Sequence, residues 1–194
     1  MKKLLLYSTI IGLPVLFSCS RSVTRVSPSE QIDISGHWNN TDSRLVSEEM
    51  TGTVLNATWL NNHLQAKSGQ KPVVIVGFVD NKSHEHIDAE TFIKDLEQSF
   101  IKTEKVRLVQ AGKKREELRA ERADQQTNSS ASTMKKFGLE MGADYILQGS
   151  INSIVDAYKK KKEVYYQVNL ELTNLETNEV VWIGDKKIAK VVKN

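Results

Sequence analysis

Apolar residues recur with helical spacing in two segments of this chain. The first segment runs from Asp42 to about Gln65 and predicts one amphipathic helix. The second begins at Asp88, because aspartate is a favoured N-cap and Ile87 and Phe92 have the spacing of a hydrophobic staple. The residues expected to face the core are Val46, Met50, Val54, Ala57, Leu60 and Leu64 in the first helix, and Ile93, Leu96 and Phe100 in the second.

Strand-like patterns lie between and after these helices. Val73 to Val79 is a continuous apolar run, which is typical of a central strand covered on both faces, and we expect a polar loop from Asp80 to His86. Val106 to Gln110 predicts a second, short strand. Glu163 to Thr173 alternates between apolar and polar residues, so we expect a half-buried antiparallel strand. Its less buried face carries Tyr165, Gln167, Asn169 and Glu171.

The remaining strands complete an α+β pattern. Asp144 to about Tyr158 predicts a third strand, and a last strand begins at Val180 after the turn at Glu176 to Asn178. The C-terminal half is therefore expected to be a meander, and the N-terminal half a βαβ-like unit. The fold class that follows is α+β, with a small antiparallel or mixed sheet of about four to five strands and helices packed mainly on one side.

Two segments between the second and third strands are also expected to be helical. Lys113 to Arg122 is almost entirely charged, so this helix should lie on the surface. A loop is expected from Gln125 to Ala131, followed by a helix capped by Ser132 that ends near Gly142. The inward residues of this last helix are Met134, Phe137 and Met141.

The first residues form a targeting signal rather than part of the fold. Lys2 and Lys3 precede an apolar stretch from Leu4 to Phe17, so residues 1–18 predict a signal peptide. The ending Leu16-Phe17-Ser18-Cys19 resembles the lipobox of bacterial lipoprotein precursors, in which the cysteine is lipidated and the chain is cut before it. Phe17 departs from the small residue usual in that motif, and an ordinary signal peptide beside a chance cysteine is the alternative.

This reading divides the chain into three parts. Residues 1–18 are the signal peptide, residues 19–36 are the lipidated Cys19 and a short flexible tether, and residues 37–194 are a single periplasmic α/β domain. At full stretch a tether of about 20 residues reaches ~70 Å. Ser20 follows the cysteine, so the aspartate that resembles an inner-membrane retention signal is absent. The acidic run that resembles a surface-export signal is absent as well. We therefore expect the protein to be anchored in the outer membrane and to face the periplasm.

Composition and charge exclude several classes of function. The 194 residues include one cysteine, so the mature chain beyond Cys19 has no thiol for catalysis, no disulfide and no cysteine-rich metal site. The formal net charge is +3. Removal of Lys2 and Lys3 with the signal peptide lowers it to +1, since the 24 acidic residues remain against 25 basic ones. A general affinity for nucleic acid is therefore not expected.

Candidate chemistry is sparse. His84-Glu85-His86, with Asp80 and Asp88 nearby, is a metal-like cluster, but a solvated loop often holds two histidines by chance. Common nucleotide-binding and hydrolase motifs do not occur in the sequence. We therefore expect no enzyme activity, no cofactor and no metal.

Two polar segments are candidates for contacting a partner. Asp80, Asn81 and Lys82 directly follow the buried strand, a frequent place for function in α/β sheets, although these residues also suit a plain turn. Lys160 and Lys161 belong to a run of four lysines bracketed by tyrosines, which is otherwise read as a solvated hairpin tip. These five residues are the predicted partner-binding positions.

The order of several motifs resembles the LpoB family of outer-membrane lipoproteins that activate penicillin-binding proteins. The motifs are VVIVGFVDNKS at 73–83, KVRLV at 105–109, GADYIL at 142–147 and LETNEVVWIG at 175–184. SGHWNNTDSRL at 35–45 is similar to members from Bacteroidetes-like bacteria. The resemblance covers about Gly36 to Lys190, together with the lipobox.

The resemblance implies a fold and a function. The fold is a small domain similar to the N-terminal domain of TolB. The function is to bind a class A penicillin-binding protein and to stimulate peptidoglycan synthesis, with no catalytic residues. We separately expect the protein to be a monomer. The tether here is shorter and poorer in proline than in the enterobacterial member. The alternative is a periplasmic structural or secretion-assembly lipoprotein of the curli-export type, without any effect on a synthase.

Overall fold

The computed structural model describes residues 22–128 and 142–193. The predicted signal peptide, the predicted lipidation site Cys19 and most of the helix predicted from Ser132 lie outside these residues. The chain divides into two compact units at Glu30 and Gln31, and the second unit contains every described helix and strand. In chain order these are α1 (Asn40–Leu55), α2 (Thr58–Ala66), β1 (Val73–Lys82), α3 (Ala89–Thr103), β2 (Arg107–Leu108), α4 (Gly112–Asn128), β3 (Tyr145–Tyr158), β4 (Lys161–Asn174) and β5 (Val180–Lys193).

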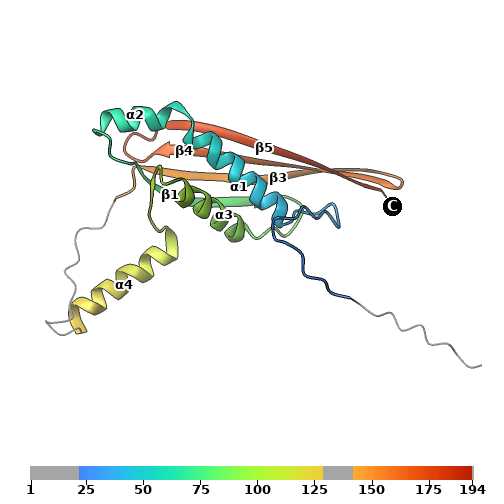
Figure 1. Cartoon of the computed structure of the whole chain (residues 1–194), viewed down its shortest axis with the longest axis horizontal. Helices are drawn as coiled ribbons and strands as arrows, with labels where there is room; N and C mark the ends of the chain where they lie inside the picture. The colour runs from blue at the N-terminus through green and yellow to red at the C-terminus, as the bar shows by residue number, and fades with distance from the viewer. Residues whose placement is uncertain (1–21, 129–141, 194) are drawn as a thin grey trace, which may run out of the picture. The chain divides into compact units, whose positions relative to one another are not determined.

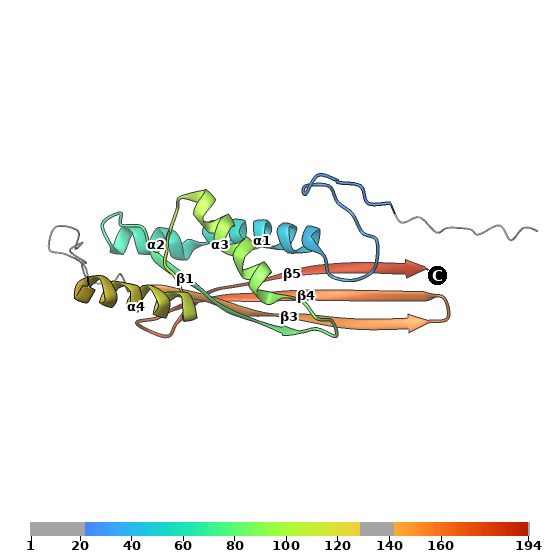
Figure 2. The ribbon, with the colours of Figure 1, turned by 90° about the horizontal axis from the view of Figure 1, so that it is seen from below.

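The sheet is mixed, which confirms the predicted α+β class. Its five strands follow the order β2-β1-β3-β4-β5, with β1 parallel to both of its neighbours. The strands β3, β4 and β5 form the predicted antiparallel meander (Figure 1). Figure 2 shows α1, α2 and α3 on the same side of this sheet.

The core lies between these helices and one face of the sheet. Val46, Met50 and Val54 of α1 join Leu96 and Phe100 of α3 in one core cluster, as the helical periods predict. Ile93, which was also expected in the core, is only half-buried, whereas Phe92 is buried. Asp88 caps α3, since its side chain accepts hydrogen bonds from the Glu90 and Thr91 amides at 2.9 and 3.4 Å. The buried face of β4 supplies the opposite wall with Val164, Tyr166, Val168, Leu170 and Leu172.

The single helix predicted over Asp42 to Gln65 is wrong, because the structure has two. α1 ends at Leu55, and α2 starts after Ala57. The indole of Trp59 donates a hydrogen bond of 2.6 Å to the Val54 carbonyl, and the Ala57 amide also donates to it, at 3.3 Å. These donors occupy the carbonyl that a continuous helix would offer to residue 58, so the helix turns and Trp59 enters the core.

Two predicted loops are also shorter than expected. Asp80, Asn81 and Lys82 belong to β1, where they pair with Ser150 to Asn152 of β3. Pairing with β3 therefore extends the strand beyond its apolar run. At the other loop, α4 continues through Asn128, so residues 125–128 are helical.

A bulge in β1 changes which of its side chains face the core. Val76 lies opposite Leu147 and Val79 lies opposite Gly149, so three steps of β1 match two steps of β3. The extra residue shifts the alternation, and Val79 is buried while Phe78 is 58% exposed. The prediction that β1 is covered on both faces therefore holds for its first four residues only.

Candidate partner-binding surface

On the sheet face away from α1, α2 and α3, α4 lines a cleft with Ile75, Ile146 and Gln148 at the β1 end. No described helix lies over the rest of β3, β4 and β5 on that side (Figure 2). The side chains there come from the alternate positions of β3, β4 and β5. Cross-strand pairing aligns them in rows, in which Gln167 lies between Asn152 and Lys187, and Asn169 lies between Ser150 and Asp185. We call this surface the open face. As predicted, Tyr165, Gln167, Asn169 and Glu171 belong to it, and they are at least partly exposed.

The open face combines polar amides and charges with large apolar side chains. Ile154 is 66% exposed and Ile183 is 70% exposed, and Phe78 adds an aromatic ring from β1. Exposed apolar side chains surrounded by polar groups are typical of protein contact surfaces. The sequence did not single out Phe78 or Ile183. Gly77 was the available signal for Phe78, because a glycine within a strand often marks a bulge.

The predicted partner-binding residues divide between two places. Because of the bulge, Asp80 and Lys82 share the open face with their partners Ser150 and Asn152. Asn81 points the other way, and its amide donates to the carbonyls of Glu85 and Ile87 at 2.8 and 3.3 Å. Asn81 therefore holds the β1–α3 connection rather than the open face.

Lys160 and Lys161 lie elsewhere along the sheet. Lys82 pairs with Asn152, whereas the β3–β4 turn follows Tyr158, six residues further along β3. At about 3.3 Å per residue this separates the two groups by roughly 20 Å. The structure therefore does not bring the five predicted residues into one site.

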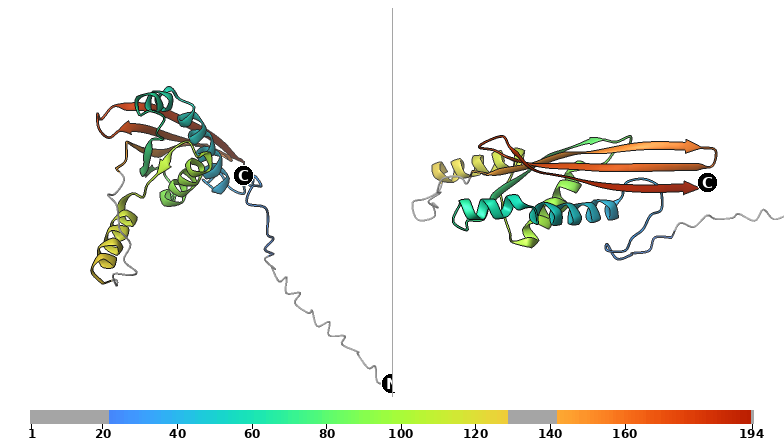
Figure 3. Two further views of the ribbon diagram at one scale, coloured as in Figure 1. Left: turned by 60° about the vertical axis from the view of Figure 1, so that its left-hand side comes forward. Right: turned by 90° about the horizontal axis from the view of Figure 1, so that it is seen from above.

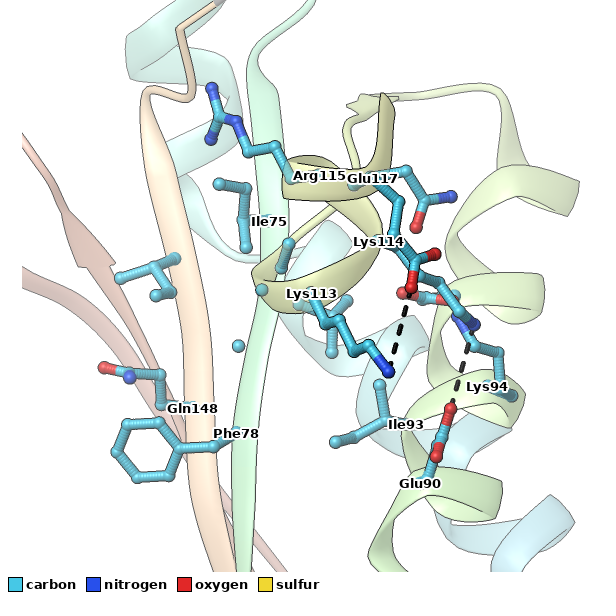
Figure 4. A pocket seen from close by; sticks show the side chains of 17 residues that line it. Ile75, Phe78, Glu90, Ile93, Lys94, Lys113, Lys114, Arg115, Glu117 and Gln148 are labelled. Carbon is cyan, nitrogen blue, oxygen red and sulfur yellow. Dashed lines mark hydrogen bonds and ion pairs between the residues drawn. The ribbon is translucent and has the colours of Figure 1, made fainter. Parts of the chain in front are cut away.

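A cleft of about 760 Å³ lies at the β1 edge of the sheet (Figure 4). It exists because β2 pairs with β1 only at Val73 and Val74, which leaves the rest of that edge without a neighbouring strand. The apolar lining includes Ile75, Phe78 and Ile93, and charged side chains from α3 and α4 surround it. Across this rim Lys114 lies 3.7 Å from Glu90, and Lys113 lies 3.9 Å from Glu117.

The segment that leads into α1 is fixed to the domain by a half-buried carboxylate, that of Glu85. We call residues Gln31 to Asn39 the N-terminal strap. Glu85 accepts a hydrogen bond from the Trp38 amide at 3.0 Å and lies 2.9 Å from His37 Nδ1. Burial alone would raise the pKa of Glu85, but hydrogen bonds from Tyr166, Trp38 and His37 outweigh it and lower that pKa.

A second ion-pair cluster holds the other part of the strap. Lys190 of β5 lies 2.7 Å from Asp33 and 2.6 Å from Asp42, the residue that completes the capping box of α1 with Asn39. Burial would lower the pKa of Lys190, but the hydrogen bonds to Asp33 and Asp42 raise it. The strap is thus attached to the β1–α3 connection through Glu85 and to β5 through Lys190.

The metal-like cluster of the sequence is separated in space. Glu85 faces Tyr166 and Trp38, whereas His84 Nδ1 lies 3.1 Å from the Ser153 hydroxyl. Within residues 22–128 and 142–193, no group of three or more His, Cys, Asp or Glu side chains is placed to hold a metal ion. None of the helices described there is both long and apolar enough to cross a bilayer.

Comparison with known proteins identifies a related family. The model of the peptidoglycan-synthase activator LpoB matches residues 42–188, which is most of the chain. The C-terminal domain of LpoB from Escherichia coli is 18% identical, with a TM-score of 0.45 over 77% of this chain and 99% of that domain. The same domain from Salmonella enterica is also 18% identical, with a TM-score of 0.45 over 76% of this chain and 98% of that one.

A more distant match is the lipoprotein GNA1162 from Neisseria meningitidis. It is 12% identical, with a TM-score of 0.41 over 63% of this chain and 84% of that chain. The comparison with curated proteins found no match.

Proposed function

This chain belongs to the LpoB family of peptidoglycan-synthase activators, and we propose that it is an outer-membrane lipoprotein that binds and activates a class A penicillin-binding protein. Activation in this family is regulatory, so the proposal assigns the chain no reaction of its own. The observation that supports a binding role is the open face, where polar rows and exposed apolar side chains meet beyond the end that α4 borders.

The proposed anchor is a lipid on Cys19 after removal of residues 1–18. Several acyl chains hold a protein on a membrane stably, since each buried methylene contributes ~0.8 kcal/mol. The compact unit begins at Gln31, so Ser20 to Glu30 connect it to the anchor. At full stretch these residues reach about 40 Å. With a connection of this length, the synthase would have to approach the outer membrane closely.

The proposed docking surface is the part of the open face around Lys82, Asn152 and Gln167. A flat sheet face offers a rigid template, because its side chains are held in register by two neighbouring strands. Ile183 would supply an apolar contact of the kind that carries most of the binding energy in protein interfaces. Lys82 and Lys187 would favour an acidic region on the synthase through complementary charge.

The experiment combines the polypeptide from Ser20 to Asn194 with the class A synthases of the same organism. We expect binding and a faster glycan polymerisation. Ile183→Asp should weaken binding at least about tenfold, since it places a charge in the proposed contact. Ile101→Asp is the matched control, because Ile101 is 61% exposed but lies on α3. Equal binding by both variants would remove the open face from the proposal, and no effect of the unchanged polypeptide on any synthase would reject activation.

A further inference from the structure

We propose that the far end of the sheet is a second interaction surface, which binds an anionic phospholipid bilayer. This end, which we call the hairpin tip, consists of residues 154–162 at the β3–β4 turn and residues 191–193 at the end of β5. Figure 1 and the right-hand view of Figure 3 show it extending past α1 and α3. The lysines of its turn lie roughly 20 Å from Lys82 and Asn152 of the docking surface proposed above, so the two surfaces can bind different partners.

The hairpin tip concentrates positive charge. Five lysines lie there: Lys159, Lys160, Lys161, Lys162 and Lys193. Asp156 and Glu163 are the acidic side chains of the same region, and they pair across β3 and β4. The side chains therefore give a net charge of +3. In the described part of the chain none of the five lysines forms an ion pair, and Lys161 even lies opposite Lys193 in the register.

Exposed apolar groups accompany these cations. Tyr158 is 73% exposed, and Ile154 and Val191 emerge on the same sheet face. The Lys159 ammonium lies 5.1 Å from the centre of the Tyr158 ring. Lysines combined with aliphatic and aromatic side chains match the headgroup region of an anionic bilayer, where the cations meet phosphates and the apolar groups enter the acyl boundary.

The backbone of the turn provides an independent argument. Lys159 has a φ of 53°, in the left-handed region that two-residue hairpins normally fill with glycine or asparagine. Lysine is strained there, and such strain persists mainly where function requires the side chain. A lysine at a position that glycine would favour supports the proposal that the tip uses its positive charge.

The N-terminal strap places the tip on the side of the domain where the anchored chain enters. Gly36 packs so closely on β5 that a Cβ on it would lie 2.5 Å from Val192. Asp33 to Gly36 line a common groove with residues 189–193. Because Ser20 to Glu30 span at most about 40 Å, a lipid on Cys19 would keep the start of the strap within that distance of the membrane. This step rests on the lipidation proposed above.

A lipid surface fits the tip better than an acidic protein patch. A protein interface normally requires fixed side chains and satisfied hydrogen bonds. The β3–β4 turn offers long lysine side chains, and within the described residues no ion pair holds them in one position. A fluid anionic surface needs only charge and apolar contact, and both are present.

The test uses the polypeptide from Ser20 to Asn194 without its lipid, which contains the whole compact unit, and vesicles with or without phosphatidylglycerol. We expect cosedimentation only with the anionic vesicles, and release at high salt. Lys160→Glu/Lys161→Glu should weaken this binding at least roughly 25-fold, about fivefold for each lysine lost. The matched control is Lys67→Glu/Lys71→Glu, because these exposed lysines precede β1 at the opposite end of the sheet and the net charge changes equally.

Three results would overturn the proposal. The first is failure of the unchanged polypeptide to bind anionic vesicles, and the second is equal binding by the two double variants. The third is a tip variant that still binds vesicles but no longer binds the synthase, which would assign the tip to the protein interface. Synthase activation is measured separately in solution, so loss of vesicle binding alone leaves the proposed function intact.

Discussion

The Tyr166 hydroxyl donates a hydrogen bond of 2.6 Å to Glu85 across 81 positions of the sequence. Tyr166 is fully buried on β4, and its hydroxyl oxygen also lies 3.0 Å from the Gly36 carbonyl oxygen. The Trp38 ring packs edge-on against Tyr166, with 5.6 Å between centroids. One phenol therefore connects the central sheet, the β1–α3 connection and the N-terminal strap.

Replacing Tyr166 should destabilise the domain without opening a large cavity. Tyr166→Phe removes the hydroxyl and leaves Glu85 with fewer donors, so we expect a loss of about 1–3 kcal/mol in the free energy of unfolding. Urea denaturation followed by tryptophan fluorescence measures it. Tyr165→Phe is the control, since Tyr165 lies on the open face next to it in sequence and should change stability by less than about 0.5 kcal/mol.

Stability should decline in acid because of Glu85. The pKa of Glu85 in the folded protein lies below its ordinary value of 4.5. Ionised Glu85 therefore stabilises the fold above pH 4.5, and this stabilisation is lost as the pH falls through the lowered pKa. Thermal unfolding at a series of pH values between about 2 and 7 would record this decline. Glu85→Gln should start less stable and lose less on acidification, and an unchanged acid profile in that variant would contradict the prediction.

An alkaline decline should follow from Tyr166 and Lys190. Burial and the Glu85 hydrogen bond raise the pKa of Tyr166 above its ordinary value of 10.0. The hydrogen bonds to Asp33 and Asp42 raise the pKa of Lys190 above its ordinary value of 10.5. Groups with raised folded pKa values contribute stability below the unfolded pKa and lose it as the pH rises. The melting temperature should therefore fall above about pH 10. Tyr166→Phe should show a smaller alkaline decline than the unchanged domain.

Two glycines should respond in opposite ways to alanine. A Cβ on Gly149 would lie 2.0 Å from the Asn169 carbonyl oxygen, so Gly149→Ala must displace β4 and should cost more than about 2 kcal/mol. A Cβ on Gly52 within α1 would meet nothing within 4 Å, so Gly52→Ala should stabilise by about 0.5–1 kcal/mol. Chemical denaturation compares them, and a tolerated alanine at position 149 would show that the β3–β4 spacing is wrong.

The strained turn predicts a conflict between stability and lipid binding. Lys159→Gly should relieve the left-handed backbone and raise stability by up to about 1 kcal/mol, while it weakens binding to anionic vesicles. Lys160 does not have a positive φ, so Lys160→Gly should weaken vesicle binding but lower stability. A Lys159→Gly variant that is less stable than the unchanged domain would contradict the conclusion that the Lys159 backbone is strained.

Local patterns in the sequence predict the elements of this fold well. The N-cap at Asp88, the alternation of Glu163 to Thr173 and the meander that follows are all confirmed, since each depends on neighbours within a few residues. The break between α1 and α2 could not be predicted in this way. It depends on the Trp59 indole reaching the Val54 carbonyl, which competes with the regular helical hydrogen bond.

By itself, the sequence determined the α+β class, the apolar strand β1, and the buried faces of the long helices and of β4. These features follow from local sequence, because apolar residues recur with the period of the helix or strand whose face is buried. Tertiary structure alone decided where the side chains of the candidate site point. The register between β1 and β3 requires a bulge, which turns Lys82 to the open face and Val79 to the core. It also turned Glu85, which the sequence placed beside two histidines, toward Tyr166. Both outcomes depend on partners more than sixty residues away in the sequence, and a local sequence pattern contains no information about such distant partners.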